Sequence, residues 1–356
     1  MLKKTLTSAV ILLFIGLALA PSINADKFED LVEFGGFFNG RTLYVGGNGP
    51  GNYTVIQYAV ENASSGDTVF VYNGTYSHYF AEKWACVRIE KSIRLLGEDR
   101  ETTIINGSGT MRVVYIHASG VVVSGFTLQQ GGSSDPSGAF GRGVDAVQEL
   151  SNIQIYNNII QDNYQGIGIQ FNTTDVSIHD NIIRGNYEGF DNGPDTFQLE
   201  IYNNTFSDNE VALPLSRYNF HVHHNFFLNN SVGIELYGGK FSSLIEYNHF
   251  QNNEVGIHLL ITRSTIKKNN FVDNTQHINL YKGATFLLIP FLTLFRQSWR
   301  NNFWNDWNTT KPRPIRGEWG LHIFVPLPRP HAVLIAMIPF YEFDWHPAQE
   351  PFDIVN

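Results

Sequence analysis

The sequence has a single cysteine, Cys86, among its 356 residues, so no disulfide bond can form within the chain. Charged residues make up only 16% of it, and 24 Lys and Arg stand against 33 Asp and Glu without any basic run. A nucleic-acid partner would need a basic stripe, so we expect none. Stability must come from packing, and Cys86 is predicted to be a small apolar core residue.

Long apolar runs are also few. After the N-terminal region, none is long enough to span a bilayer as a helix. The two strongest are 285–295, which Pro290 interrupts, and 331–341. We expect these runs to pack together and close the C-terminal end of the fold. Peripheral membrane contact through 285–295 and 331–341 is the alternative.

The N-terminal residues follow the pattern of an export signal. Lys3 and Lys4 precede an apolar run over residues 9–19, and small residues follow. We place a signal peptide at residues 1–25. A secreted protein, extracellular or at the cell surface, is therefore expected, with an uncleaved membrane anchor as the alternative.

A repeat of 21 to 23 residues is the strongest pattern in the chain. Asn recurs at positions 158, 181, 204, 225, 248 and 269, and a second Asn follows each after five residues, at 163, 186, 209, 230, 253 and 274. Short apolar alternations separate these positions, and no unit holds ten residues of helical periodicity. We therefore predict an all-β fold, a single-stranded right-handed parallel β-helix (a solenoid) whose coils each carry three short strands.

The recurrent asparagines are predicted to be structural. Asn tolerates the left-handed backbone conformation that suits a tight corner, and its amide can bond to backbone groups there. Coils stacked about 4.8 Å apart would also bring these amides into hydrogen-bonded ladders. We expect each Asn both to turn the chain and to tie neighbouring coils.

A stacked solenoid needs closed ends, because a bare terminal coil exposes its interior and its strand edges. Residues 52–63 predict an N-terminal capping helix, with Thr54 and Gln57 as a capping box. We place the β-helix at residues 40–305 and an irregular apolar C-terminal capping tail at 306–356. A Gly- and Ser-rich segment, Gly131 to Gly143, is predicted to project from one face as a loop.

Several segments near the start of the predicted coils resemble those of a known class of proteins. They are Asn52–Gln57, Ser65–Val69, Tyr72–Tyr76, Lys91–Ile93 and Leu96–Glu98. With the repeats, over residues 40 to 305, the chain resembles the carbohydrate-binding and sugar-hydrolase (pectate-lyase-like) class of β-helix domains, especially its NosD-like branch. The resemblance implies the fold and an exported protein, and for some members a role in copper-site maturation. The Asp-Asp pair and Gly-His-Gly usual in pectin-cleaving members are missing here.

The repeat also predicts which residues share an outward face. The first strands present Gln154, Ser177, Glu200, His221, Leu244 and Thr265 in one column, and Tyr156, His179, Tyr202, His223, Glu246 and Lys267 in the next. His179, His221, His223 and Glu200 are candidate metal ligands, since imidazole and carboxylate suit zinc or copper. A solvated sheet face is the alternative, favoured by the lack of Cys or Met ligands.

The third strands present Gly168, Asp191, Pro214, Glu235, His258 and Asn279, flanked by Gln170, Ser216, Tyr237 and Tyr281. Acids and aromatic rings suit sugar hydroxyls and sugar faces, so Asp191, Glu235, Tyr237 and Tyr281 are candidate ligand-binding residues. If the protein is an enzyme, the candidate catalytic residues are Asp191, Glu235 and His258. Asp191 and Glu235, two coils apart, would be separated by about 9.6 Å, near the upper limit for an inverting pair.

Three functions follow as hypotheses. The first is an exported module without catalysis and without a cofactor, which either binds polysaccharide or a cell-envelope glycan or is itself associated with the cell envelope. The second is a polysaccharide lyase or glycoside hydrolase that acts in a groove on the β-helix. The third is a NosD-like protein that handles copper or another metal. Calcium or copper is the cofactor to expect if the first hypothesis fails.

Overall fold

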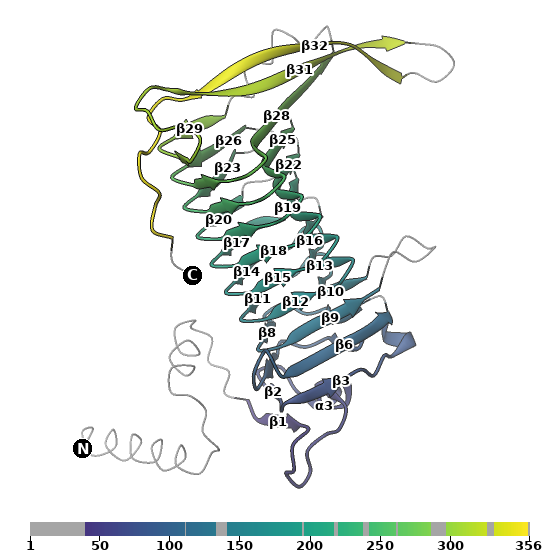
Figure 1. Cartoon of the computed structure of the whole chain (residues 1–356). Helices are drawn as coiled ribbons and strands as arrows, with labels where there is room; N and C mark the ends of the chain where they lie inside the picture. Colours follow the sequence, from purple (N-terminus) through teal and green to yellow (C-terminus); the bar gives the residue numbers. More distant parts are fainter. Residues whose placement is uncertain are drawn as a thin grey trace, which may run out of the picture. The chain divides into compact units, whose positions relative to one another are not determined.

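Three β-sheets, wound by one chain, form the part of the molecule that the structure describes (Figure 1). The computed structural model describes residues 40–110, 112–132, 141–193, 196–216, 220–237, 242–260, 263–285, 297–325 and 331–354. Each coil contributes one short strand to each sheet in turn, which gives the right-handed parallel β-helix that the repeat predicts. The predicted signal peptide at 1–25 lies outside the described residues.

The sheets follow the order of strands in each coil. The first sheet contains β1 (Thr42–Val45), β2 (Thr68–Val71), β5 (Arg94–Gly97), β8 (Val122–Ser124), β11 (Ser151–Tyr156), β14 (Thr174–His179), β17 (Phe197–Tyr202), β20 (Phe220–His223), β23 (Ser242–Glu246), β26 (Arg263–Lys267) and β29 (Ser298–Arg300). The second contains β3 (Gly74–Tyr76), β6 (Thr103–Thr110), β9 (Thr127–Gly131), β12 (Ile159–Gln161), β15 (Ile182–Arg184), β18 (Thr205–Ser207), β21 (Phe226–Leu228), β24 (His249–Gln251), β27 (Asn270–Val272) and β30 (Phe303–Trp304). The third contains β4 (Val87–Ile89), β7 (Arg112–Ile116), β10 (Arg142–Ala146), β13 (Gln165–Ile169), β16 (Glu188–Asn192), β19 (Val211–Ser216), β22 (Val232–Tyr237), β25 (Val255–Leu260), β28 (Gln276–Thr285), β31 (Arg313–Val325) and β32 (His331–Asp344).

The interior is a continuous column of apolar side chains. Alternate residues of each strand point inward, so the same position of successive coils lies one above another. In the second sheet the inward positions are all buried: Ile160, Ile183, Phe206, Phe227, Phe250 and Phe271. The four Phe rings and then Trp304 stack nearly parallel, with centroids 4.4 to 5.1 Å apart. Cys86 is buried in the same core, as predicted.

Two ladders of buried asparagines run along the corners on either side of the second sheet. In the first, from Asn158 to Asn302, each amide nitrogen donates to the side-chain oxygen of the next asparagine at 3.0 to 3.1 Å. In the second, from Asn163 to Asn274, the same bonds measure 2.8 to 3.2 Å. The backbone N–H of each asparagine donates to the same oxygen, as Asn158 does to Asn181. The predicted ladders are confirmed.

The expectation that these asparagines also turn the chain is wrong. The left-handed residue at each corner is the one before the ladder asparagine. At the first corner these residues are Asn157, Asp180, Asn203, His224, Tyr247, Lys268 and Asn301, with φ between +53° and +56°. Two neighbouring residues at each corner therefore have separate roles. The first turns the chain, and the second keeps an inward side chain and a backbone N–H aligned with the ladder.

The N-terminal end is closed by α3 (Ile56–Asn62), as predicted, which packs on β1, β2 and β4. A 3-10 turn, η1 (Ala81–Lys83), lies farther along the same region of the chain. The predicted capping box is wrong, because the N-cap residue is Val55 and no side chain caps the helix. Gln57 is buried and bonds instead to the backbone N–H and C=O of Arg88 in β4. The Gln57 amide thus provides hydrogen-bond partners for backbone groups at the open edge of the third sheet. These groups would lack that partner if Gln57 capped the helix.

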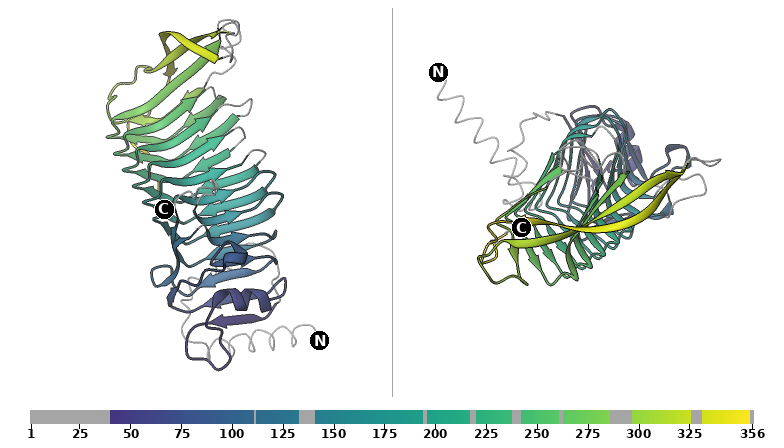
Figure 2. Two further views of the ribbon diagram at one scale, coloured as in Figure 1. Left: turned by 90° about the vertical axis from the view of Figure 1, so that its right-hand side faces the viewer. Right: turned by 90° about the horizontal axis from the view of Figure 1, so that it is seen from above.

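The C-terminal end is closed by a long β-hairpin in place of the irregular tail expected. β31 and β32 pair in antiparallel fashion from Arg313 with Asp344 to Val325 with His331. β31 also joins β28 in parallel, so the hairpin extends the third sheet. It lies across the end of the stacked coils (Figure 2). Residues 286–295 of the first apolar run and 133–140 of the predicted loop lie outside the described residues.

Two buried contacts fasten the hairpin. Nζ of Lys282 lies 2.6 Å from Oε1 of Glu342, and Trp299 donates to the other oxygen at 2.8 Å. Asp344, fully buried, accepts from the backbone and side-chain nitrogens of Asn302. Its carboxylate therefore takes the place of the next asparagine in the first ladder. Within the described segments, no helix has the length and apolar character needed to cross a bilayer.

Candidate functional site

The outward face of the third sheet carries the predicted column of acids. Gly168 pairs with Asp191, and Pro214, Glu235, His258 and Asn279 follow one another on successive coils. β16 and β19 pair through Glu188 and Val211, which sets Asp191 one coil from Pro214. The predicted register is confirmed, and Asp191 and Glu235 are two coils apart.

An arginine that sequence reasoning missed organises one end of this face. Arg142 donates to Asp145 at 2.9 Å, to Gln165 at 2.7 Å and to Asp191 at 2.9 Å. Arg112 donates to the second oxygen of Asp145. Both oxygens of the buried Asp145 are thus bound to guanidinium groups, and Asp191 is held at the end of the same network.

Gly168 makes room for this network. A Cβ at position 168 would lie 2.5 Å from Nε of Arg142 and 2.6 Å from its Cδ, so Arg142 lies directly over the glycine. The signal for Asp145 is present in the sequence, because extending the repeat one coil upstream aligns Val144 with Ile167. Arg142 lies within the Gly- and Ser-rich segment Gly131 to Gly143, where the repeat is interrupted, and no spacing identifies it.

Burial and hydrogen bonding shift the pKa values of the carboxyl groups in opposite directions. It raises the pKa of Asp191 above its ordinary value against the opposing charge of Arg142, and it raises the pKa of Glu188 as well. Burial acts on Glu235 too, but hydrogen bonds with His258 and Tyr237 outweigh it and hold the pKa of Glu235 below its ordinary value. Carboxyl groups with divergent pKa values are what acid–base chemistry on sugars uses.

Glu235 is fixed by neighbours on both sides. Nδ1 of His258, on the next coil, lies 3.0 Å from its Oε1. Burial and the hydrogen bond to Glu235 raise the pKa of Tyr237, whose ring remains exposed. Asp191, Glu235, His258 and Tyr237 therefore lie on one face. Tyr281 lies against β31 instead, because a Cβ built on Gly320 would meet its hydroxyl at 2.0 Å.

The predicted metal ligands lie on the outward face of the first sheet. Glu200 pairs with His221 and Tyr202 with His223 on the next coil. Oε1 of Glu200 lies 3.1 Å from Nε2 of His223 and 3.5 Å from Nδ1 of His221. One ligand atom from each of the three residues lies within 4.8 Å of the others, a spacing that suits one metal ion.

Further charged groups surround this cluster. Oε1 of Glu246 lies 3.2 Å from Nε2 of His221, and its second oxygen accepts from Lys267. Burial lowers the pKa of His223 although Glu200 opposes the change, so His223 favours the neutral form that binds metals. Burial on its own would raise the pKa of Glu246, but its bonds to Lys267 and His221 lower it.

His179 is not brought into the cluster. Its ring stacks between Tyr156 and Tyr202, with centroid distances of 5.0 and 4.7 Å. Tyr202 in turn stacks on His223 at 5.2 Å. The first four members of the predicted column therefore form a stack of alternating Tyr and His rings, and Tyr202 separates His179 from the other candidate ligands.

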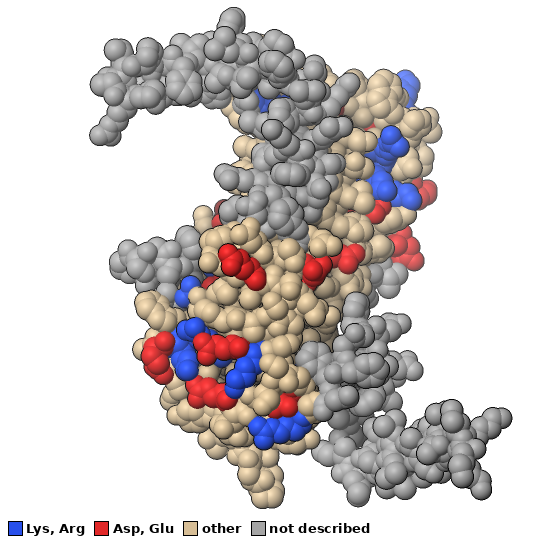
Figure 3. All heavy atoms as spheres, turned by 180° about the vertical axis from the view of Figure 1, so that it is seen from behind, with Lys and Arg blue, Asp and Glu red and all other residues tan. Residues whose placement is uncertain are grey.

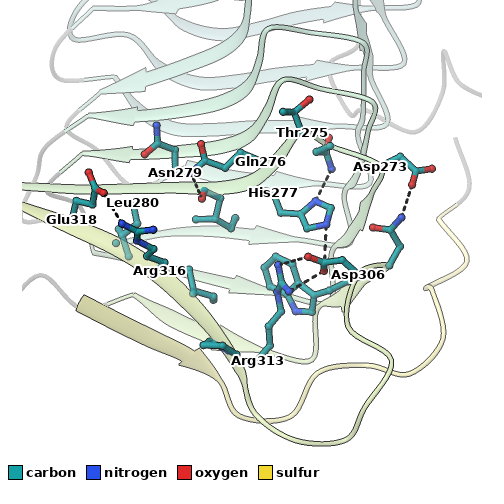
Figure 4. A pocket seen from close by; sticks show the side chains of 17 residues that line it. Asp273, Thr275, Gln276, His277, Asn279, Leu280, Asp306, Arg313, Arg316 and Glu318 are labelled. Atoms are coloured by element: carbon teal, nitrogen blue, oxygen red, sulfur yellow. Dashed lines mark hydrogen bonds and ion pairs between the residues drawn. The ribbon is translucent and has the colours of Figure 1, made fainter. Parts of the chain in front are cut away.

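A cavity of about 740 Å³ opens at the C-terminal end, beside β28, β30 and β31. β31 pairs with β28 from Gly317 and Leu280 onward, and the cavity lies between the preceding residues of the two strands. Figure 4 shows His277 pointing toward Asp306 within it, with Arg313 on the other side of the carboxylate. Nδ1 of His277 also lies 3.2 Å from the amide of Asn274, so the cavity lies at the end of the second ladder.

The charged groups of this cavity pair with one another. Arg313 donates to both oxygens of Asp306 at 2.8 and 3.1 Å, and its guanidinium lies over the ring of Trp304. Burial lowers the pKa of Arg313 against the pull of Asp306. No pattern in the sequence predicts this site, because Asp306 and Arg313 lie after the last recognisable repeat.

Charge is mixed over the rest of the surface that Figure 3 shows. Acidic and basic side chains lie side by side toward the N-terminal end, and acidic groups without basic neighbours lie near the middle. No single basic patch dominates this view.

Solved structures with a similar fold include several proteins that act on carbohydrates. A GH136 lacto-N-biosidase from Eubacterium ramulus matches with a TM-score of 0.54 and 11% identity, over 74% of this chain and 60% of that one. An alginate lyase from Paenibacillus sp. str. FPU-7 matches with a TM-score of 0.47 and 14% identity, over 68% and 93%. Pectate lyase Pel9A matches with a TM-score of 0.41 and 14% identity, over 68% and 75%. At these identities the likeness concerns the fold alone.

A family model matches most of the chain. The chain matches no curated protein. The family described as periplasmic copper-binding protein (NosD) matches residues 60–315, which run from α3 through every later coil to the start of β31. This span includes both the third-sheet face and the His and Glu cluster of the first sheet. The chain belongs to the NosD family, with the right-handed parallel β-helix as its fold.

Proposed function

We propose that this protein is an exported β-helix that binds neutral carbohydrate chains on the outward face of its third sheet without cleaving them. The observation that carries the proposal is the row of Asp191, Glu235 and Tyr237, in which hydrogen-bonded carboxylates lie beside an exposed ring. Carboxylates accept hydrogen bonds from sugar hydroxyls, and aromatic rings pack on sugar faces. Because Arg142 and His258 already hold the carboxylates, little further ordering is needed on binding.

Charge supports a neutral ligand over an anionic one. From β7 to β22 the face carries four carboxyl groups and two guanidinium groups, on Asp145, Glu188, Asp191, Glu235, Arg112 and Arg142. The whole chain has a formal net charge of −9. A polyanionic chain would therefore meet like charge on approach, and like charges suppress wrong partners.

Calorimetric titration with a panel of neutral and acidic polysaccharides tests the proposal. We expect saturable binding to at least one neutral polysaccharide and weaker binding to acidic ones. Glu235→Gln should weaken binding about tenfold, because it removes a charge-assisted acceptor. Glu210→Gln, an exposed carboxylate outside the row, is the matched control. Equal affinities for the two variants would contradict the proposal.

The same samples distinguish binding from catalysis. The pKa of Asp191 is raised and that of Glu235 is lowered, the directions that an acid–base pair requires, so release of reducing ends and of unsaturated sugars should be measured alongside binding. We expect no product above the buffer control. Product that disappears in both Asp191→Asn and Glu235→Gln would replace the proposed binding function with a hydrolase or lyase.

A second candidate function, binding of copper or zinc, is favoured by the cluster of Glu200, His221 and His223. Its three ligand atoms lie within 4.8 Å of one another on adjacent coils. The family description names copper binding, which supports copper first. Two imidazoles and a carboxylate leave a fourth position for water or for a transferred ligand.

Metal titration tests this second candidate. We expect one equivalent of Cu²⁺ or Zn²⁺ to bind, and His221→Ala or His223→Ala to weaken binding at least tenfold. His249→Gln, on the second sheet, is the control for a general loss of imidazole. If no saturable site appears near one equivalent, or if the control weakens binding equally, the cluster is a solvated face and not a metal site.

A further inference from the structure

The C-terminal hairpin carries an unusual length of uncharged chain. Between Glu318 in β31 and Glu342 in β32, Arg329 is the one Lys, Arg, Asp or Glu. The described side chains of β32 in this stretch are exposed apolar groups for the most part. They include Leu334, Ala336, Met337, Ile338, Pro339 and Tyr341, with exposed fractions of 44 to 55% for the four large ones. A water-facing strand rarely has this composition, so the hairpin has the character of a contact surface.

These apolar side chains occupy both faces of the ribbon. Successive residues of a strand point to opposite faces. Ala336 and Ile338 therefore share one face, while Met337, Pro339 and Tyr341 share the other. Leu334 joins the second face, because the pairing with β31 shifts by one residue between Leu334 and Ala336. A protein partner lying against the hairpin would cover one face and leave the other in water. A lipid environment surrounds both.

Aromatic residues lie where charged residues resume. Tyr341 and Trp345 are 55% and 59% exposed, and they flank Glu342 and Asp344 in the sequence. Trp319, paired with Ile338, follows directly after Glu318 on the opposite strand. Trp and Tyr are the residues enriched at the boundary between lipid and water. The base of the hairpin, around Trp319, Tyr341 and Trp345, thus has the aromatic residues expected at such a boundary.

The base is also held firmly to the solenoid. Lys282 and Glu342 form a buried ion pair that Trp299 completes, and Lys282 lies over the ring of Phe340 at 4.7 Å. Breaking a buried pair of this kind by removing one partner is costly. The hairpin therefore keeps its direction relative to the coils, and Figures 1 and 2 show it extending past the edge of the stack.

The outer edge of β32 is poorly suited to pairing with a second copy of the chain. Pro339 lacks an N–H, and proline is one of the devices that blunt sheet edges. The pairing of β31 and β32 is also irregular at Leu321 and His322. Two copies would therefore not extend the sheet across this edge in regular register.

We propose that the β31–β32 hairpin docks this protein onto a lipid bilayer by inserting into its interfacial region. It does not cross the hydrocarbon core, because its open edge presents backbone groups that need water or lipid headgroups. The proposal does not depend on carbohydrate binding, and each can fail without the other. Docking by this end would direct the coils and their outward faces away from the membrane surface.

Tryptophan fluorescence gives a selective test in the full chain. Five of the six tryptophans lie at or after Trp299 and none precedes Trp84, so the apolar N-terminal region contributes no signal. Phosphatidylcholine vesicles with brominated acyl chains quench only nearby tryptophans. We expect vesicles to quench the wild type, and the double substitution Met337→Lys with Ile338→Lys to reduce the quenched fraction at least threefold. Trp345→Phe should lower quenching while co-flotation with vesicles is retained.

The controls separate docking from misfolding and self-association. Tyr58→Lys, an exposed aromatic on α3, should leave quenching unchanged. The double variant must keep the wild-type β-sheet circular dichroism and melting temperature to be interpreted, and Leu334→Lys provides a milder variant if it does not. Quenching that is absent in the wild type, or equal in the double variant, overturns the proposal. A wild-type dimer that the double variant converts to a monomer, without any quenching, would assign the surface to a second copy instead.

Discussion

At the scale of single residues, the third-sheet face depends on a glycine and an arginine that meet. Gly168 has no side chain, and Arg142 uses that space to reach Asp145 and Asp191 together. The acids of this face are therefore held by their neighbours before any ligand arrives. We therefore expect a small substitution beneath Arg142, at Gly168, to disturb the acids that Arg142 holds on this face.

Gly168→Ala tests this coupling. The added methyl group overlaps Arg142, so we expect a loss of about 1–3 kcal/mol in the free energy of unfolding. In an Arg142→Ala background the same substitution should cost much less, because nothing then occupies the space. Chemical denaturation of the four proteins in this double-mutant cycle gives the coupling. Equal costs in both backgrounds would show that Arg142 does not lie over the glycine.

Asp67 gives a prediction for acid stability. Its carboxylate accepts from the backbone N–H groups of Ser64 and Arg41 at 2.8 and 2.9 Å, and these bonds hold its pKa below the ordinary value. A group whose pKa is lower in the folded state stabilises the fold above its unfolded pKa, and this contribution disappears as the pH falls through the folded pKa. The cost of Asp67→Asn should therefore be largest near neutral pH.

Denaturant unfolding at a series of pH values measures this cost. We expect Asp67→Asn to lose about 2 kcal/mol at pH 7, from hydrogen bonds to a charged group. The difference from the wild type should persist to about pH 4, near the pKa of an unfolded Asp, and shrink below it. A difference that grows on acidification would contradict the assigned direction.

At the scale of elements, the asparagine ladders link one coil to the next, and Asp344 ends one of them. Its carboxylate oxygen accepts from Asn302 and from the indole N–H of Trp304. Asp344→Ala would leave these donors buried without partners, and we expect a loss of about 2–5 kcal/mol from the three hydrogen bonds removed. Asp344→Asn keeps an oxygen there and should cost clearly less. Thermal and denaturant unfolding of the two variants, with exposed Asp353→Ala as control, check the order.

At this scale there is a physical reason why the sequence predicts some elements and not others. Repetition predicts the coils, their register and the ladders, because each position of a coil must satisfy the same neighbours above and below. At the end of the repeat a residue does not have the same neighbours on both sides. No pattern in the sequence therefore predicts the contacts of Asp344, Lys282 and Glu342. The left-handed positions escaped notice for another reason. They are occupied by His224, Tyr247 and Lys268 as well as by Asn and Asp, and residue type alone does not identify them.

At the scale of the whole molecule, the solenoid presents different chemistry on its faces and its end. The third sheet carries acids beside Tyr237, the first sheet carries the His and Glu cluster, and the C-terminal hairpin carries exposed apolar groups. The register of the candidate sites could be predicted, since each is a column down a sheet. The contribution of Arg142 and the enclosure of Tyr281 by β31 could not, because both depend on segments outside the regular repeat.

The most direct test of carbohydrate binding is a crystal structure of the protein with an oligosaccharide from the neutral polysaccharide that binds best. The account predicts a sugar ring against Tyr237, with a hydroxyl group within hydrogen-bonding distance of Glu235 or Asp191. A sugar found only elsewhere, such as in the cavity beside His277 and Arg313, with the third-sheet face empty, would contradict it.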